Sequence, residues 1–304
     1  MLRGHDEEWL RRTYETSGMA RKSAIVDCLP DGYSFEGKRV LDFGCGAGRV
    51  LRQFLPEAES GEFWGCDLHA PTISWLDQNL SPPLHFYVND RIPLPHPDEY
   101  FDLVYALSVF THITGDWSAW LLELRRILKP GGLLLATFMG PATWEQTVKH
   151  PVEEEKLGMV VLGLHRPLET TSGPIVLHSP WWIRSHWGRA FEITLLRPYG
   201  FATPERGHGV VVARKTEASV TRDELERPDP TDPREADAQL EQRRLLEESV
   251  GRLLDPAKRR QFERAQAEHG MPGLFVPQSS PWERLVQRAR WAYLRARARV
   301  GRRA

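Results

Sequence analysis

The sequence predicts an α/β fold: a doubly wound, mostly parallel seven-stranded sheet with a terminal antiparallel strand pair, followed by a helical C-terminal extension. Short apolar runs alternate with stretches of helical spacing, which is typical of a sheet covered by helices on both faces. Two further runs follow one another late in the chain and predict the antiparallel pair. The predicted strands lie at residues 39–43, 61–66, 85–88, 101–107, 133–138, 191–197 and 208–214.

Helices are predicted between these strands because apolar residues recur there at intervals of three and four. The first helix precedes the sheet, and a Ser17-Gly18 pair predicts a break within it. The predicted helices cover residues 5–29, 70–80, 117–128 and 181–187.

The segment 140–180 has a looser pattern and is expected to form a lid-like insertion. Within it, residues 159–165 and 173–178 predict a hairpin.

The domain organisation follows from a change of composition near residue 216. Residues 1–216 are predicted to form one domain whose core is 35–140. The polar stretch 217–234 contains three prolines and predicts a linker, and residues 235–304 predict a charged helical extension.

The last segment, Trp282–Ala304, carries eight arginines against the single Glu283. A basic amphipathic helix of this kind binds anionic membranes, nucleic acid or acidic proteins. Packing against the acidic remainder of the same chain is the equally open alternative. The expected contacts are therefore a membrane surface or an acidic protein.

Composition excludes several classes of protein. The formal net charge of −1 over 304 residues gives no reason to expect nucleic acid as the main partner. The three cysteines are scattered and form no CxxC pair, so neither a disulfide framework nor a metal site is expected. Because the N-terminus is charged and no apolar run reaches about 20 residues, a cytoplasmic protein is predicted, with possible peripheral membrane contact.

The strongest local motif is VLDFGCGAGR, residues 40–49, in which an apolar strand leads to an acidic residue and three alternating glycines. Glycine lets the backbone turn sharply and lets a ligand lie against bare peptide groups at the start of a helix. The motif therefore predicts a site for a nucleotide-like ligand. A turn without a ligand is the simpler alternative.

This motif resembles the first motif of class I S-adenosylmethionine-dependent methyltransferases, an acidic residue followed by GxGxG. A dinucleotide-binding loop would have a third glycine where Arg49 stands. The resemblance implies that Asp42 engages the amino group of S-adenosyl-L-methionine. It also implies that the loop wraps the methionine end of this cofactor through Gly44, Cys45, Gly46 and Gly48.

The next strands extend the resemblance over about residues 35–140. Asp67 ends the second strand and would accept hydrogen bonds from the ribose hydroxyls, beside Leu68. Capping the following helix is its alternative role. The family's adenine contacts would come from Asp90, Arg91 and Leu107, although Asp90 could instead cap a turn and Asn89 could serve in its place.

Methyl transfer from a sulfonium depends on alignment, and a general base is optional. His112, just beyond the fourth strand, is the predicted base, because ligands bind at the carboxyl edge of such sheets. A packed or capping histidine is the alternative. Weaker candidates near the acceptor or the cofactor are His165, His178, His186, Tyr14 and Trp9.

The acceptor is expected to be a small molecule, a sugar, a lipid or a natural-product intermediate, methylated on oxygen or nitrogen. The chain has Ala106-Leu107-Ser108-Val109 where methylases of base amines carry a proline-containing box. Two other functions stay open: a nicotinamide-dependent oxidoreductase and a non-catalytic cofactor-binding or assembly protein.

Overall fold

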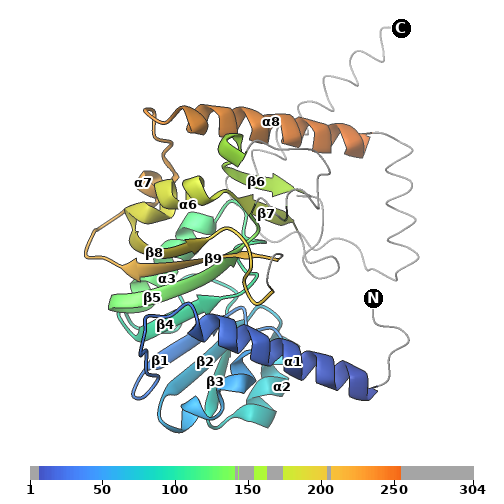
Figure 1. The fold of residues 1–304 in the computed structure, drawn as a ribbon, viewed down its shortest axis with the longest axis vertical. Helices are drawn as coiled ribbons and strands as arrows, with labels where there is room; N and C mark the ends of the chain where they lie inside the picture. The colour runs from blue at the N-terminus through green and yellow to red at the C-terminus, as the bar shows by residue number, and fades with distance from the viewer. Residues whose placement is uncertain (1–6, 141–142, 144–153, 163–173, 204–206, 255–304) are drawn as a thin grey trace, which may run out of the picture.

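The computed structural model describes residues 7–140, 143, 154–162, 174–203 and 207–254. A seven-stranded sheet in the order β3-β2-β1-β4-β5-β9-β8 forms its centre (Figure 1). The predicted fold class and all seven predicted strands are confirmed, with ends that shift by up to five residues. The strands are β1 Arg39–Phe43, β2 Glu62–Asp67, β3 Leu84–Val88, β4 Phe101–Ala106, β5 Leu128–Phe138, β8 Phe191–Arg197 and β9 Gly209–Lys215.

The strand register places the loops that follow β1, β2 and β4 at one edge. β1 pairs in parallel with β2 and β4, and β4 pairs in parallel with β5. β9 runs antiparallel between β5 and β8, with Phe138 opposite Gly209. The beginning of β9 therefore lies at the carboxyl edge of β5, where the parallel strands also end.

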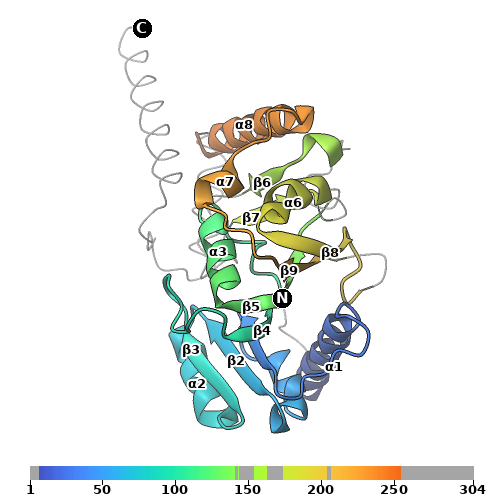
Figure 2. The same cartoon turned by 90° about the vertical axis from the view of Figure 1, so that its left-hand side faces the viewer.

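Helices cover both faces of the sheet (Figures 1 and 2). One apolar core joins Leu41 and Phe43 to α3 and α6, and the other joins Val40 to α1 and to the turns after β1. Strand alternation explains this division, because successive side chains point to opposite faces. The helices are α1 Glu7–Val26, α2 Ala70–Leu80, α3 Trp117–Ile127 and α6 Pro180–His186.

The first helix is continuous, so the predicted break at Ser17-Gly18 is wrong. A Cβ atom added to Gly18 would lie 2.4 Å from the backbone oxygen of Arg49. Gly18 therefore permits α1 to approach the glycine-rich loop closely, and its lower helix propensity is offset by the surrounding helix.

The glycine-rich loop does not lead into an α-helix, contrary to the expectation from its sequence. It continues into two short 3-10 helices, η1 Leu51–Phe54 and η2 Glu57–Glu59. Pro56 separates them, and its missing N–H prevents the continuous hydrogen-bonding of an α-helix. Among the described residues no α-helix directly follows the loop, so ligand binding there would depend on its peptide groups and on neighbouring carboxylates.

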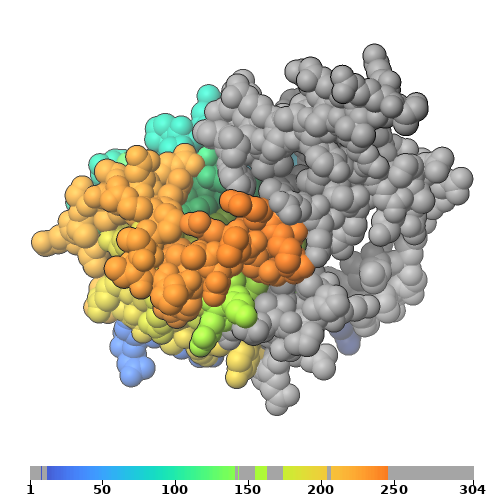
Figure 3. All heavy atoms as spheres, turned by 90° about the horizontal axis from the view of Figure 1, so that it is seen from above, coloured from blue at the N-terminus to red at the C-terminus, as the bar shows by residue number. Residues whose placement is uncertain are grey.

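The predicted hairpin in the insertion is present as β6 Met159–Leu162 and β7 Ile175–His178, which pair antiparallel. The chain then differs from the linker expected at 217–234. α7 Arg222–Glu226 lies there, begun by a capping box at Thr221 and Glu224, and its Leu225 is fully buried. α8 Pro233–Leu254 follows and packs on β6 at the end of the molecule that Figure 3 faces.

Residues 255–304, including the basic segment Trp282–Ala304, lie outside the described residues. In the part of the chain that the structure describes, no helix combines the length and the apolar character needed to cross a bilayer.

Candidate functional site

The glycine-rich loop is fixed to the sheet by its own backbone. The N–H groups of Gly44 and Cys45 both donate to the Cys66 carbonyl oxygen at 2.9 Å, which ties the end of β1 to β2. Gly44 has φ +81°, and a Cβ atom there would lie 2.4 Å from Cγ2 of Val109. At Gly48 a Cβ atom would lie 2.8 Å from Leu76. These two glycines are therefore required by packing within the protein itself.

Gly46 differs from its neighbours because its backbone faces open space. Its φ is +53°, and a Cβ atom built on it would meet nothing within 4 Å. Its N–H donates to Oδ2 of Asp67 at 2.9 Å. Bare peptide beside a carboxylate is the arrangement that a polar nucleoside needs in order to approach the chain closely.

Asp67 joins the ends of the first two strands. While Oδ2 accepts from Gly46, Oδ1 accepts from the His69 N–H at 3.0 Å. His69 is itself the N-cap of α2, so Asp67 supports the start of that helix. A carboxylate has about four acceptor positions, which leaves capacity for ribose hydroxyls. Leu68, between them, is 58% exposed and presents an apolar surface at the same edge.

Asp42 lies at the end of β1 and is only 3% exposed. Burial raises the pKa of its carboxyl to about 8, the interaction with Tyr105 opposes this rise, and the negative charge of Asp67 adds to it. An acid buried in this way becomes ionised most readily when a cation arrives beside it. Asp42 and Asp67 together form an acidic pair suited to a cationic ligand.

Of the residues predicted to contact adenine, the structure places Asp90 and Asn89 in different environments. Asp90 is exposed and forms an ion pair with Arg91, with 3.2 Å between Nε and Oδ1. Asn89 is 5% exposed instead, and its N–H donates to the Asp67 carbonyl oxygen at 3.2 Å. Its Oδ1 atom has no hydrogen-bond partner among the described residues. A buried amide oxygen without a partner is costly, which favours a ligand donor at this position.

The N-terminal helix reaches the loop through Tyr14. The Tyr14 hydroxyl donates to the Ala47 carbonyl oxygen at 2.7 Å, and the guanidinium groups of Arg49 and Arg52 lie 6.0 and 5.8 Å from its ring centre. α1 thus holds the far side of the loop. Trp9 belongs to the same helix, but its side chain lies outside the described part.

His112, the predicted base, is half-buried, with Nδ1 2.8 Å from the Pro174 carbonyl oxygen. Since a carbonyl only accepts, Nδ1 carries the proton of this hydrogen bond. Leu107 lies at the end of β4 and packs against the core that contains Tyr105.

The other two candidate histidines that the structure describes belong to β7 and α6. Burial lowers the pKa of His178 to about 3, so this side chain is neutral. His186 is buried against Trp182, with ring centres 4.3 Å apart, and it binds Glu235 of α8. His165 lies outside the described residues.

Sequence reasoning missed Ser108 and His208, which the fold brings together across 100 residues. Ser108 Oγ and His208 Nδ1 are 3.2 Å apart at the carboxyl edge. The available signal was the antiparallel terminal strand: a strand that runs against its parallel neighbours begins at the edge where they end.

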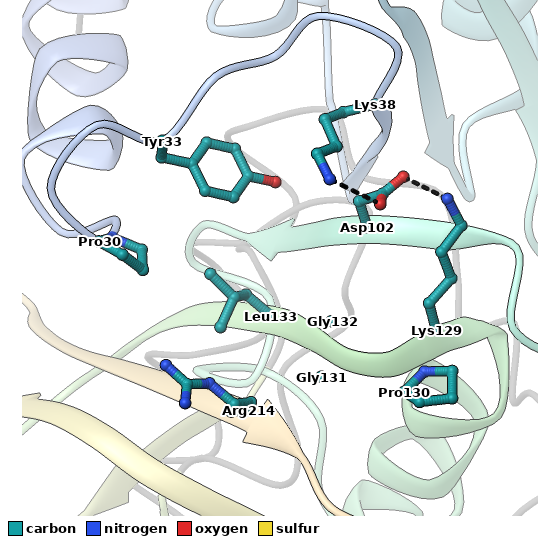
Figure 4. A pocket seen from close by; sticks show the side chains of 10 residues that line it. All are labelled: Pro30, Tyr33, Lys38, Asp102, Lys129, Pro130, Gly131, Gly132, Leu133 and Arg214. Atoms are coloured by element: carbon teal, nitrogen blue, oxygen red, sulfur yellow. Dashed lines mark hydrogen bonds and ion pairs between the residues drawn. The ribbon is translucent and has the colours of Figure 1, made fainter.

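A cavity of about 320 Å³ lies at the opposite edge, where β4 and β5 begin (Figure 4). Its charged groups are already paired: Asp102 accepts from Lys38 at 3.4 Å and from Lys129 at 2.7 Å, and Arg214 pairs with Glu192 at 3.5 Å. Ligands of doubly wound sheets bind at the carboxyl edge, so we assign this cavity no part in the candidate site.

Comparison with known proteins finds relatives for the part of the chain that contains the glycine-rich loop. Residues 40–132 match the family model of the methyltransferase domain. Over 114 residues the chain is 34% identical to phthiotriol/phenolphthiotriol dimycocerosates methyltransferase 1 of Mycobacterium ulcerans, covering 36% of this chain and 42% of that protein. Over 119 residues it is 32% identical to the fatty-acid O-methyltransferase of Mycolicibacterium smegmatis, covering 37% and 43%. The chain thus spans about two fifths of the length of these relatives.

A solved structure extends the likeness to the fold. A chain of the complex between the Haloferax volcanii Trm112 methyltransferase activator and a methyltransferase superposes with a TM-score of 0.51 at 17% identity. The superposition covers 68% of this chain and 93% of that one. Residues 40–132 therefore belong to the methyltransferase domain family, and the chain has the class I fold of the S-adenosylmethionine-dependent methyltransferases.

Proposed function

We propose that the protein transfers a methyl group from S-adenosyl-L-methionine to a small, lipid-like acceptor. The observation that carries the proposal is the open space over Gly46, bounded by the carboxylate of Asp67. Asp42 and Asp67 match the positive charge of the cofactor, and the unpartnered Asn89 oxygen offers an acceptor for its adenine amine. Bound there, the cofactor supplies an activated methyl group on a sulfonium.

The proposed lipid-like character of the acceptor rests on the relatives. One of the two relatives is a fatty-acid O-methyltransferase, and the other is a methyltransferase of phthiotriol and phenolphthiotriol dimycocerosates. The match to the family model covers residues 40–132, which contain the proposed cofactor site, so we place the acceptor surface in the remaining chain. β6, β7, α6 and α8 are the described elements that stand beside the sheet and are available for it.

Asp67 gives the most direct test of the cofactor site. We expect Asp67→Ala to weaken S-adenosylmethionine binding by about 1–3 kcal/mol, because charge-assisted hydrogen bonds to the ribose are lost. Titration calorimetry measures the dissociation constant of S-adenosylmethionine, and a separate titration with NAD⁺ tests the alternative ligand. Asp98→Ala is the matched control, because Asp98 is an exposed carboxylate paired with Arg126. Equal dissociation constants for wild type and Asp67→Ala would remove Asp67 from the site, and tight NAD⁺ binding would favour an oxidoreductase.

The raised pKa of Asp42 predicts a pH dependence of binding. Below about pH 8 the carboxyl of the free protein is protonated, whereas the cationic cofactor favours the carboxylate. Affinity should therefore rise with pH toward 8, with proton release on binding at pH 7. Calorimetry in two buffers of different ionisation enthalpy measures the released proton, and Asp42→Asn should abolish it.

The raised pKa of Asp42 also determines the direction in which the stability of the folded protein changes with pH. Because the pKa in the folded protein lies above its ordinary value of 3.8, the contribution of Asp42 to stability is complete at low pH and is lost as pH rises toward 8. Urea unfolding of the ligand-free protein should thus show a stability decline between about pH 4 and 8 that is smaller in Asp42→Asn. A decline of equal size in both proteins would contradict the assignment.

The basic C-terminal segment extends this proposal. We propose that the basic segment Trp282–Ala304 contacts an anionic membrane or an acidic protein, supported by its excess of arginine. Such contact would bring a cytoplasmic enzyme to a membrane-borne acceptor. Cosedimentation with anionic vesicles, compared with a chain that ends at residue 254, tests it.

A further inference from the structure

Ser108 occupies a strained position next to the cofactor loop. Its φ is +59°, a left-handed conformation that non-glycine residues rarely adopt. Its N–H donates to Oγ1 of Thr137 at 2.8 Å, and Thr137 is 1% exposed within β5. The next residue, Val109, packs against Gly44 of the loop. A strained residue held by a buried partner beside a ligand site favours a functional role.

The side chain at this turn is directed to His208. Ser108 Oγ lies 3.2 Å from His208 Nδ1, and His208 is half-buried immediately before β9. Within the described ranges the His208 ring has no second hydrogen bond, so no described protein group occupies Nε2. Ser108 therefore fixes the plane of the ring without occupying the nitrogen that could react.

The surroundings keep His208 neutral. Burial lowers the pKa of this imidazole, and the charges of His112 and of Arg21 from α1 lower it further. The second histidine, His112, has its own Nδ1 occupied by the Pro174 carbonyl oxygen. A neutral imidazole near physiological pH can accept a proton directly.

We propose, building on the methyltransferase function above, that His208 is the catalytic base for a protic acceptor and that Ser108 is its positioning residue. In the step, the acceptor O–H or N–H loses its proton to His208 Nε2 as the bond from that oxygen or nitrogen to the methyl carbon forms. The sulfur–methyl bond breaks at the same time, and the sulfur keeps the electron pair. The charge of the sulfonium is thereby replaced by that of the imidazolium.

This role requires one tautomer. Nε2 can accept a proton only if Nδ1 already carries one and donates it to Ser108 Oγ. Long-range ¹H–¹⁵N spectra of the imidazole rings, recorded on the protein with S-adenosylhomocysteine, should show His208 neutral at pH 7 and protonated at Nδ1. Ser108→Gly tolerates the positive φ but lacks the hydroxyl, so this preference should weaken in it. A wild-type ring protonated at Nε2 overturns the proposal.

Methyl transfer supplies the second readout. The probes are S-adenosylmethionine with a long-chain alcohol, a hydroquinone, a long-chain primary amine and a fatty acid. We expect an O–H or N–H acceptor to be methylated, and His208→Gln to lower kcat about 100-fold or more with the cofactor Kd unchanged. The residual rate should rise with pH. Ser108→Gly should lose less, and Ser108→Asn, which tolerates this backbone and carries a side-chain oxygen, should restore part of the rate.

A control variant and several possible outcomes distinguish the role of His208 from the methyltransferase function itself. His85→Gln replaces a histidine that stacks on Trp64 near the start of β3, at the other end of the strand from this edge, and should match wild type. Methylation of the fatty acid alone, or full activity of His208→Gln, overturns the role of His208 while the methyltransferase stands. Cofactor binding without methylation of any probe also counts against a protic acceptor. Absence of cofactor binding instead contradicts the proposed function itself.

Discussion

Gly46→Leu is expected to weaken S-adenosylmethionine binding at least 100-fold while leaving the protein folded. The side chain would enter the open space over the loop, because nothing lies within 4 Å of the Cβ position. The cost to the fold is limited to the positive φ of +53°, about 1–2 kcal/mol for a non-glycine residue. Loss of binding would therefore come from occupation of the site.

The matched control is Gly32→Leu. Gly32 has φ +72° and also has nothing within 4 Å of its Cβ position, but it lies in the turn after α1. Both variants carry a similar backbone penalty, so urea unfolding should give similar free energies, whereas calorimetry should find cofactor binding impaired only in Gly46→Leu. If the two variants bind the cofactor equally well, Gly46 does not border the site. Gly44→Ala would be less informative, since its Cβ would collide with Val109 and disturb the fold.

Glu235→Ala is expected to lower the free energy of unfolding by about 1–3 kcal/mol, the cost of leaving a buried polar group without its hydrogen-bond partner. Glu235 is 6% exposed, and its Oε1 lies 3.0 Å from Nε2 of His186. The other ring nitrogen of His186 lies 2.6 Å from the Leu225 carbonyl oxygen. The imidazole of His186 therefore joins α6, α7 and α8. Removal of the Glu235 carboxylate would leave its Nε2 buried without a hydrogen-bond partner.

The comparison variant is Glu241→Ala on the same helix. Glu241 pairs with Arg244 at 2.6 Å, and this pair is more exposed than that of Glu235, with 53% of the arginine side chain and 22% of the glutamate side chain exposed. Exposed pairs contribute about 0–1 kcal/mol, so urea unfolding should separate the two variants clearly. Equal losses would mean that α8 is held to the core by its apolar contacts alone, such as that of Ala238 with Gly158.

The sequence was sufficient for the features that depend on local pattern. Alternating apolar runs located the strands, and the spacing of Asp42 and the glycines located the loop that the structure places at the sheet edge. The reasons for the individual glycines of this loop were not readable from the local sequence, however. Gly44 and Gly48 turn out to be required by Val109 and Leu76, which lie far away in the sequence, and only Gly46 faces open space.

What was missed depends on contacts between distant segments. Gly18 looked like a helix break because its neighbour, the Arg49 carbonyl, cannot be seen from the helix sequence. The prolines at 228, 230 and 233 suggested a linker, yet the capping box at Thr221 and Glu224 was readable and marks the helix whose Leu225 is buried. His208 was hidden because its role depends on Ser108, a partner 100 positions earlier.

The position of β9 has a consequence for synthesis on the ribosome. β8 is made before β9 but pairs with the sheet only through it. Until residue 215 has left the exit tunnel, the edge of β5 opposite β4 has no strand partner, and β8 has no strand with which to pair. A nascent chain stalled before that point exposes an unpaired edge, the kind of surface that chaperones protect and that otherwise aggregates.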